Sequence, residues 1–159
     1  MLSHTTVPST TRLDELVAAV TLGARSPFPI KETGTTLFLY KDATGLENVQ
    51  TEIVRMGKKG KDIQSGLGAS LEPPKISTAT ALLCTSGHIE TAPGEVSILK
   101  PLVNPKEIEG KTLRIWKRGQ TVRDEKEIGP GLNIIGPDLC YLWPNDVPFI
   151  ALHSRIKSS

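Results

Sequence analysis

The sequence has few aromatic residues, few cysteines and no long apolar run. Its aromatic residues are two tryptophans, two tyrosines and three phenylalanines in 159 residues. So few rings disfavour a glycosidase site, where paired carboxylates are usually flanked by sugar-stacking aromatics. No apolar run approaches the roughly 18 residues that a membrane helix needs. No basic start precedes the first apolar stretch, so we expect neither a transmembrane segment nor a secretory signal, and we predict a cytoplasmic protein.

The number of cysteines and the net charge limit which classes of protein this can be. Two cysteines, Cys84 and Cys140, cannot form a disulfide scaffold, and each has leucine neighbours, so we expect buried structural thiols. The chain carries 19 Lys and Arg against 17 Asp and Glu, a formal net charge of +2. This balance is too small for a protein that binds polyanions over its whole surface. Any such binding must come from local clusters of basic residues.

Length and composition predict one globular domain. The chain has 159 residues and a mass of 17.2 kDa, and its hydrophobic and charged fractions, 38% and 23%, are close to globular averages. Residues 1 to 10 are polar and rich in Ser and Thr, so we expect a flexible N-terminal arm there. The single domain is then expected to span residues 11 to 159.

Two helices are predicted in the first third of the chain. Thr11 with Asp14 is a capping pattern ahead of an apolar stripe that ends near Gly23. Thr44 with Glu47 is a second capping box, followed by a stripe that ends at Gly57. A long loop rich in lysine and glycine is expected at about 57 to 75, because no periodicity crosses it.

Short β-strands are predicted on either side of the second helix and mostly after it. Their turns are rich in Pro, Gly, Asn and Asp. Helices first and strands later predict an α+β fold: one or two N-terminal helices, then a mainly antiparallel β-sheet or small β-sandwich. The expected strands span residues 35–40, 76–84, 95–99, 112–117, 132–135, 139–143 and 149–153.

Two arrangements of cysteine and histidine contain the groups of a functional site. The run from Cys84 through His88 to Glu90 contains a thiol, an imidazole and a carboxylate, the groups of a nucleophilic centre. Neighbours on one strand diverge, however, and no oxyanion motif accompanies them, so we expect Cys84 in the core and His88 near solvent. Cys84, His88, Cys140 and His153 would supply four zinc ligands, but their spacing is unusual, and we predict no metal and no cofactor.

Basic clusters are the most informative surface feature. Strand alternation places Arg114, Trp116 and Arg118 on one face, where an aromatic ring among cations suits a polyanion or an ordinary solvated sheet. A second cluster lies at and beyond the end of the second helix, where it also complements the helix dipole. The predicted polyanion-binding residues are Arg55, Lys58, Lys59, Lys61, Arg114, Trp116, Lys117 and Arg118.

These features favour a non-enzymatic structural or assembly protein, such as a viral coat- or matrix-like subunit that forms homo-oligomers. Its expected partners are further copies of itself and either a nucleic acid or an anionic membrane surface. One alternative is a monomeric or dimeric nucleic-acid-binding module. The other is a small thiol- or histidine-dependent enzyme that uses Cys84 or His88.

Overall fold

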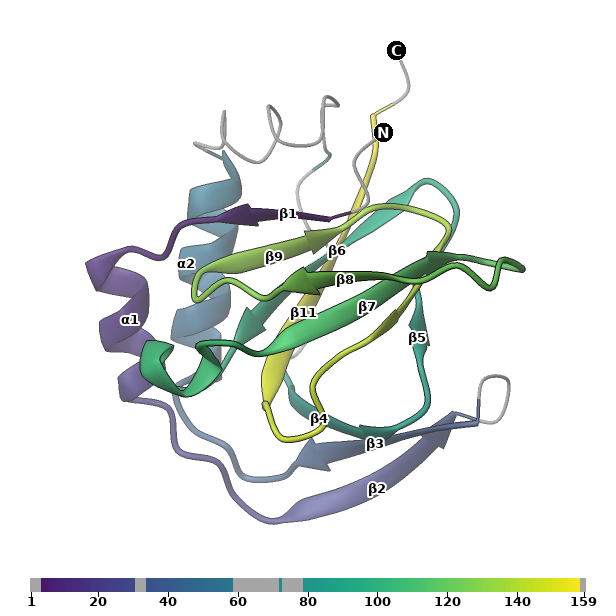
Figure 1. The fold of residues 1–159 in the computed structure, drawn as a ribbon. Helices are drawn as coiled ribbons and strands as arrows, with labels where there is room; N and C mark the ends of the chain where they lie inside the picture. The colour runs from purple at the N-terminus through teal and green to yellow at the C-terminus, as the bar shows by residue number, and fades with distance from the viewer. Residues whose placement is uncertain (1–3, 31–33, 59–71, 73–78, 158–159) are drawn as a thin grey trace.

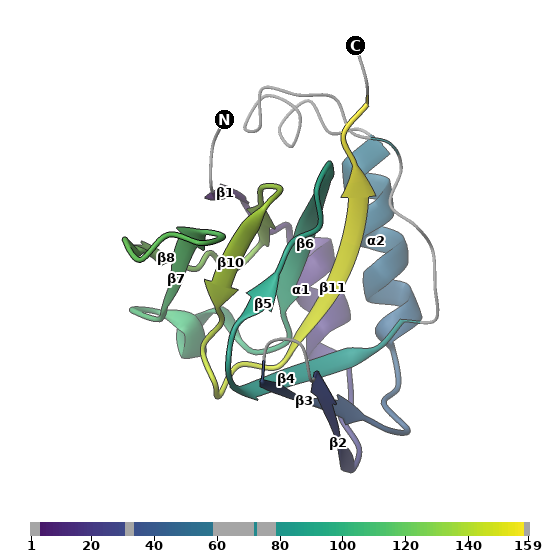
Figure 2. The same cartoon turned by 90° about the vertical axis from the view of Figure 1, so that its right-hand side faces the viewer.

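The protein is described here from a computed structural model, in which residues 4–30, 34–58, 72 and 79–157 are placed. It has three layers: two helices, a seven-stranded sheet and a four-stranded sheet (Figure 1). The turned view shows α2 on one side of β6 and β11, with β7, β8 and β10 on the other (Figure 2). Among the placed residues, no helix is long and apolar enough to cross a membrane.

Both predicted helices are present, with small shifts at their ends. Helix α1 spans Thr11–Ala18, and its N-cap is Thr10, whose hydroxyl accepts a hydrogen bond from the Leu13 amide at 3.1 Å. Helix α2 spans Leu46–Lys58. Gly45 precedes it at φ 85°, a left-handed conformation that favours glycine, so this residue forms the entry to the helix and not its first turn.

All strand pairs within the two sheets are antiparallel. The larger sheet has the order β1-β9-β6-β11-β4-β3-β2, and the smaller has the order β5-β10-β7-β8. A short 3-10 helix, η1 (Pro105–Ile108), precedes β7. The strands of the larger sheet are β1 (His4–Val7), β2 (Arg25–Ile30), β3 (Thr35–Tyr40), β4 (Ala81–Ser86), β6 (Glu95–Pro101), β9 (Leu132–Ile135) and β11 (Phe149–Arg155). Those of the smaller sheet are β5 (Ile89–Glu90), β7 (Thr112–Lys117), β8 (Asp124–Glu127) and β10 (Leu139–Leu142).

Two apolar layers hold the three structural layers together. Between the helices and the larger sheet lie Leu13 and Ile53 of the helices, against Ile98 and Ile134 of the strands. Between the two sheets lies a second layer, formed by Leu37, Leu99, Ile135 and Phe149 of the larger sheet with Leu113, Ile115, Leu139 and Tyr141 of the smaller. Because side chains alternate along a strand, the second layer also determines which residues face outward from the smaller sheet.

The α+β class and the mainly antiparallel sheet are confirmed, but the order of helices before strands is wrong. A strand, β1, precedes α1 and pairs with β9 through His4 and Ile135. The sequence signal was weak because β1 is a short edge strand of polar residues that needs a distant partner. The expectation of a flexible arm over residues 1 to 10 therefore fails for His4–Val7.

Three further strands were not predicted, and all are short or atypical. Strand β2 contains Pro27 and Pro29, which are tolerated because β2 is at the edge of its sheet. Strand β8 is composed only of charged, exposed residues, and β5 has two residues. Most of the expected loop at 57–75 and the first part of the expected strand at 76–84 lie outside the described residues.

One charged side chain is buried among the apolar residues of β6. Lys100 is 1% exposed, and its ammonium group donates a hydrogen bond to the carbonyl oxygen of Pro130 at 2.6 Å. Burial lowers the pKa of Lys100 from 10.5 to about 8, although the charge of Asp14 partly opposes this shift. The folded protein therefore releases the proton of Lys100 at a lower pH than the unfolded chain does.

We predict that Lys100 makes the fold more stable as pH rises. Between the folded pKa of about 8 and the unfolded value of 10.5, the unfolded chain binds more protons, so the free energy of unfolding increases with pH. Denaturant unfolding measures the free energy of unfolding of wild type and Lys100→Met. Between about pH 8 and pH 10, this free energy should rise by about 2 kcal/mol more in the wild type than in the variant. The two cysteines titrate in both proteins, so the comparison removes their effect. Parallel pH curves would contradict the prediction.

Candidate metal-binding site on the outer face of the smaller sheet

The outer face of the four-stranded sheet carries polar and ionisable side chains. Leu139 and Tyr141 of β10 and Ile115 of β7 point into the layer between the sheets. The alternate residues, Cys140 on β10 and Trp116 on β7, therefore lie on the opposite face. Sequence alternation predicted this outward face for Arg114, Trp116 and Arg118.

Strand register then aligns three of these side chains in one row. Cys140 is paired with Trp116 on one side and with Glu90 of β5 on the other. Directly paired residues of antiparallel strands extend to the same face with their Cβ atoms about 5 Å apart. His88, which precedes β5, lies two residues before Glu90 and therefore on the same face, at the end of the sheet.

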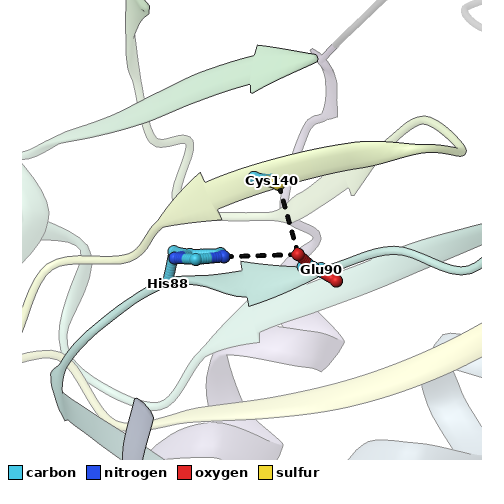
Figure 3. A group of neighbouring side chains, drawn as sticks. All are labelled: His88, Glu90 and Cys140. Carbon is cyan, nitrogen blue, oxygen red and sulfur yellow. Dashed lines mark hydrogen bonds and ion pairs between the residues drawn. The ribbon is translucent and has the colours of Figure 1, made fainter. Parts of the chain in front are cut away.

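His88, Glu90 and Cys140 form a compact cluster (Figure 3). His88 Nε2 lies 3.3 Å from Glu90 Oε1, and Cys140 Sγ lies 3.7 Å from the same oxygen. One ligand atom from each of the three residues lies within 4.8 Å of the others. Cys140 is buried, whereas the side chains of His88 and Glu90 are 30% and 34% exposed. Solvent therefore reaches the cluster from the side of the imidazole and the carboxylate.

Neighbouring side chains orient the cluster. Arg118 lies 3.5 Å from Glu90 Oε2 and donates to the carbonyl oxygen of Thr91 at 3.1 Å. The guanidinium thus holds one carboxylate oxygen while the other faces His88 and Cys140. Trp116 contacts the His88 ring edge to face, with centroids 5.3 Å apart, and Arg123 lies over the same indole at 4.2 Å.

The charges around Cys140 favour its protonated form. Burial raises the pKa of the Cys140 thiol, and the negative charge and hydrogen bond of Glu90 raise it further, while Arg118 acts in the opposite direction. A protonated thiol beside a carboxylate is a poor nucleophile. A divalent cation would reverse this balance, because it stabilises thiolate and carboxylate together.

The spacing of the three groups fits one ion. Zinc binds nitrogen and oxygen at about 2.0 to 2.2 Å and sulfur at about 2.3 Å, so tetrahedral ligands are roughly 3.4 to 3.6 Å apart. The two measured separations, 3.3 and 3.7 Å, are close to these values. Two of the three separations therefore match tetrahedral ligands, and the third, between His88 and Cys140, is at most 4.8 Å.

The structure brings together only two of the four residues that the sequence offered as zinc ligands. His88 and Cys140 come together, whereas Cys84 lies in the layer between the sheets and His153 contacts Ser97 on β6. The Cys84 thiol donates to the carbonyl oxygens of Ser86 and Gly87, and burial raises its pKa. As expected, Cys84 is in the core, and no contact within the described ranges pairs its thiol with the His88 ring.

Sequence reasoning named Glu90 only as an orienting acid in a run with Cys84, and it did not join Glu90 to Cys140. The usable signal was local: a strand places His88 and Glu90, two residues apart, on the same face. Cys140 is 50 residues away from Glu90, and only the pairing of β5 with β10 brings it to them.

The predicted basic residues are spread over two parts of the molecule. Arg55 pairs with Glu52 on α2. Lys58 ends α2, and Lys59 and Lys61 lie outside the described residues. Arg114, Trp116, Lys117 and Arg118 are on or beside β7, where Trp116 and Arg118 already contact the His88 cluster. Polyanion binding by these eight residues stays a prediction that none of these contacts tests.

Comparison with known proteins gives a distant structural likeness. No family model matches the chain, and no curated protein does. Among solved structures, the chain is similar to a crystal structure of a Pseudomonas putida prolyl-4-hydroxylase, with 12% sequence identity and a TM-score of 0.47. The match covers 99% of this chain and 93% of the hydroxylase chain.

This finding corrects the functional prediction. A non-enzymatic coat- or matrix-like assembly subunit was expected, whereas a solved structure to which this chain is distantly similar is a prolyl-4-hydroxylase. We therefore do not retain the assembly-subunit prediction. At this TM-score and identity, the activity and substrates of the hydroxylase are not transferred to this chain, and the expectation of a non-enzyme is not confirmed. The outer face of the smaller sheet has to be interpreted from its own residues.

We predict that Glu90 and Arg118 shift the reactivity of Cys140 in opposite directions. Glu90→Gln removes a charge that raises the thiol pKa, so alkylation of Cys140 by iodoacetamide near neutral pH should become about three- to tenfold faster. Arg118→Gln should slow the reaction, because it removes a cation that lowers the pKa. Peptide mass spectrometry measures both rates, with Cys84 as the internal control. Equal rates in wild type and Glu90→Gln would contradict the prediction.

Proposed function

We propose that this protein binds a single divalent transition-metal ion through His88 Nε2, a Glu90 carboxylate oxygen and Cys140 Sγ. The observation that carries the proposal is the convergence of these three atoms within 4.8 Å, from strands that are distant in sequence. Glu90 lies between the other two, so one ion can replace the two protons that the carboxylate now accepts as hydrogen bonds.

The ligand types select the metal. Thiolate and imidazole prefer borderline or soft ions such as Zn²⁺, Co²⁺ and Fe²⁺, whereas Mg²⁺ and Ca²⁺ prefer all-oxygen sites. The bound set would carry two negative ligand charges, which neutralise a divalent ion. Arg118 on Glu90 Oε2 is the neighbour that would orient the coordinating carboxylate.

The proposed site is open and not closed. Three protein ligands leave a fourth tetrahedral position, which is the arrangement of catalytic zinc sites, while structural sites use four protein ligands. The partial exposure of His88 and Glu90 supports an open position that solvent could reach. An ion here would supply Lewis-acid activation of a bound water or carbonyl group. We therefore favour a metal-dependent enzyme over a purely structural metal site.

Cobalt titration of metal-depleted protein tests the proposal. We expect one Co²⁺ per chain and a near-ultraviolet band from thiolate-to-cobalt charge transfer, because Cys140 supplies the sulfur. Cys140→Ser should abolish the band. His88→Ala and Glu90→Gln should each weaken Co²⁺ binding at least tenfold, since each removes one of three ligands.

Two matched variants serve as controls. Cys84→Ser alters the other buried thiol, and His153→Ala alters a histidine of the larger sheet, so both should keep the band and the affinity. Thermal melts identify any variant that fails to fold. A charge-transfer band that survives in Cys140→Ser, or unchanged Co²⁺ affinity in Glu90→Gln, would overturn the assignment.

A further inference from the structure

A pocket of about 440 Å³ is lined by Gly87, the residue before His88 of the proposed metal site. The volume is within the range of about 300 to 1,000 Å³ that small-molecule sites occupy. Its walls come from the end of β4 and the turn that follows it, from β7 and β8, and from the end of β10 and the residues after it. The lining residues that determine what the pocket can bind are Thr85, Ser86, Arg114, Glu125, Leu142 and Trp143.

The positive and the negative side chain of the pocket, Arg114 and Glu125, are direct cross-strand neighbours. Arg114 on β7 is paired with Leu142 of β10 on one side and with Glu125 of β8 on the other. Glu125 accepts a hydrogen bond from the Thr112 hydroxyl at 2.8 Å, which leaves further acceptor positions on its carboxylate. In the parts of the chain that the structure describes, no hydrogen bond or ion pair engages the Arg114 guanidinium.

The other walls divide into polar and apolar parts. Thr85 and Ser86 contribute hydroxyl groups near the turn. Leu142, Trp143 and Pro144 contribute apolar surface. The indole nitrogen of Trp143 already donates to the carbonyl oxygen of Val147 at 3.0 Å, so its ring offers the pocket an apolar surface and no free donor.

The adjacent charges of Arg114 and Glu125 determine which charges a ligand of this pocket should carry. An anion bound to Arg114 alone would lie close to the negative charge of Glu125, and a cation bound to Glu125 would lie close to Arg114. A molecule with both charges satisfies the two side chains without repulsion. We propose that this pocket binds a small zwitterion of the α-amino-acid class, with its carboxylate on Arg114, its ammonium group on Glu125 and an apolar side chain against Leu142 and Trp143.

The pocket proposal does not depend on the metal site. Its charged residues, Arg114 and Glu125, are distinct from the three proposed metal ligands. Binding is therefore measured on protein kept in a chelator, so that a failure of either proposal leaves the other one standing.

Isothermal titration calorimetry with three probes tests the proposal. L-leucine carries both charges and an apolar side chain, 4-methylpentanoate lacks the ammonium group, and 3-methylbutylamine lacks the carboxylate. We expect L-leucine to bind at least tenfold more tightly than either analogue. Arg114→Gln and Glu125→Gln should each weaken L-leucine binding at least tenfold, because each removes one charge-assisted contact.

Two controls on β8 match these charge changes. Lys126→Gln removes a positive charge and Asp124→Asn removes a negative one, at exposed positions that do not line the pocket. Both should bind L-leucine as the wild type does. Arg114 and Glu125 are exposed, so their variants are expected to fold, and circular dichroism checks this. Tighter or equal binding of 4-methylpentanoate, or the absence of heat from all three probes, would overturn the proposal.

Discussion

The apolar layer between the two sheets is the contact on which the candidate site depends. Leu113, Ile115, Leu139 and Tyr141 pack from the smaller sheet onto the larger one. Their burial requires that the intervening residues face away from the core, because the side-chain period of a strand is two. A shift of one residue in either β7 or β10 would place apolar side chains in solvent and ionisable groups in the core. The same packing that forms the core therefore fixes which side chains of β7 and β10 face outward.

Glu90 is the residue through which the groups of this face interact. Its two carboxylate oxygens are divided between Arg118 on one side and the pair of His88 and Cys140 on the other. This division fixes the orientation of the carboxylate and keeps the thiol protonated in the absence of a cation. The same geometry that disfavours a thiolate nucleophile favours a metal ligand, since an ion removes the repulsion between thiolate and carboxylate.

The metal cluster and the pocket occupy adjacent rows of one sheet face. Cys140 and Trp116 form one row, and Leu142 and Arg114 form the next, two residues along the same two strands. Two residues of a strand span about 7 Å. His88 follows Gly87, which lines the pocket, so the turn after β4 borders both places. A ligand in the pocket would thus lie next to the cluster of His88, Glu90 and Cys140.

The sequence by itself determined the elements whose signal is local. Capping residues and apolar stripes located α1 and α2, and short apolar segments bounded by turn residues located β7, β9 and the start of β10 within a residue or two. Alternation also placed Arg114 and Trp116 on an outward face. Strands without such a pattern, namely β1, β2, β5 and β8, were missed, because their residues are polar, proline-containing or too few.

Only the tertiary structure decided which distant residues meet. His88 and Glu90 are neighbours in sequence, but their approach to Cys140 depends on the pairing of β5 with β10. The separation of Cys84 and His153 from this cluster depends on their places in the larger sheet. Strand pairing and register depend on the burial of side chains from segments that are distant in sequence. Local residue preferences do not predict this burial. For that reason the sequence showed which residue types were available for the candidate site. Only the pairing of the strands showed which of these residues lie together.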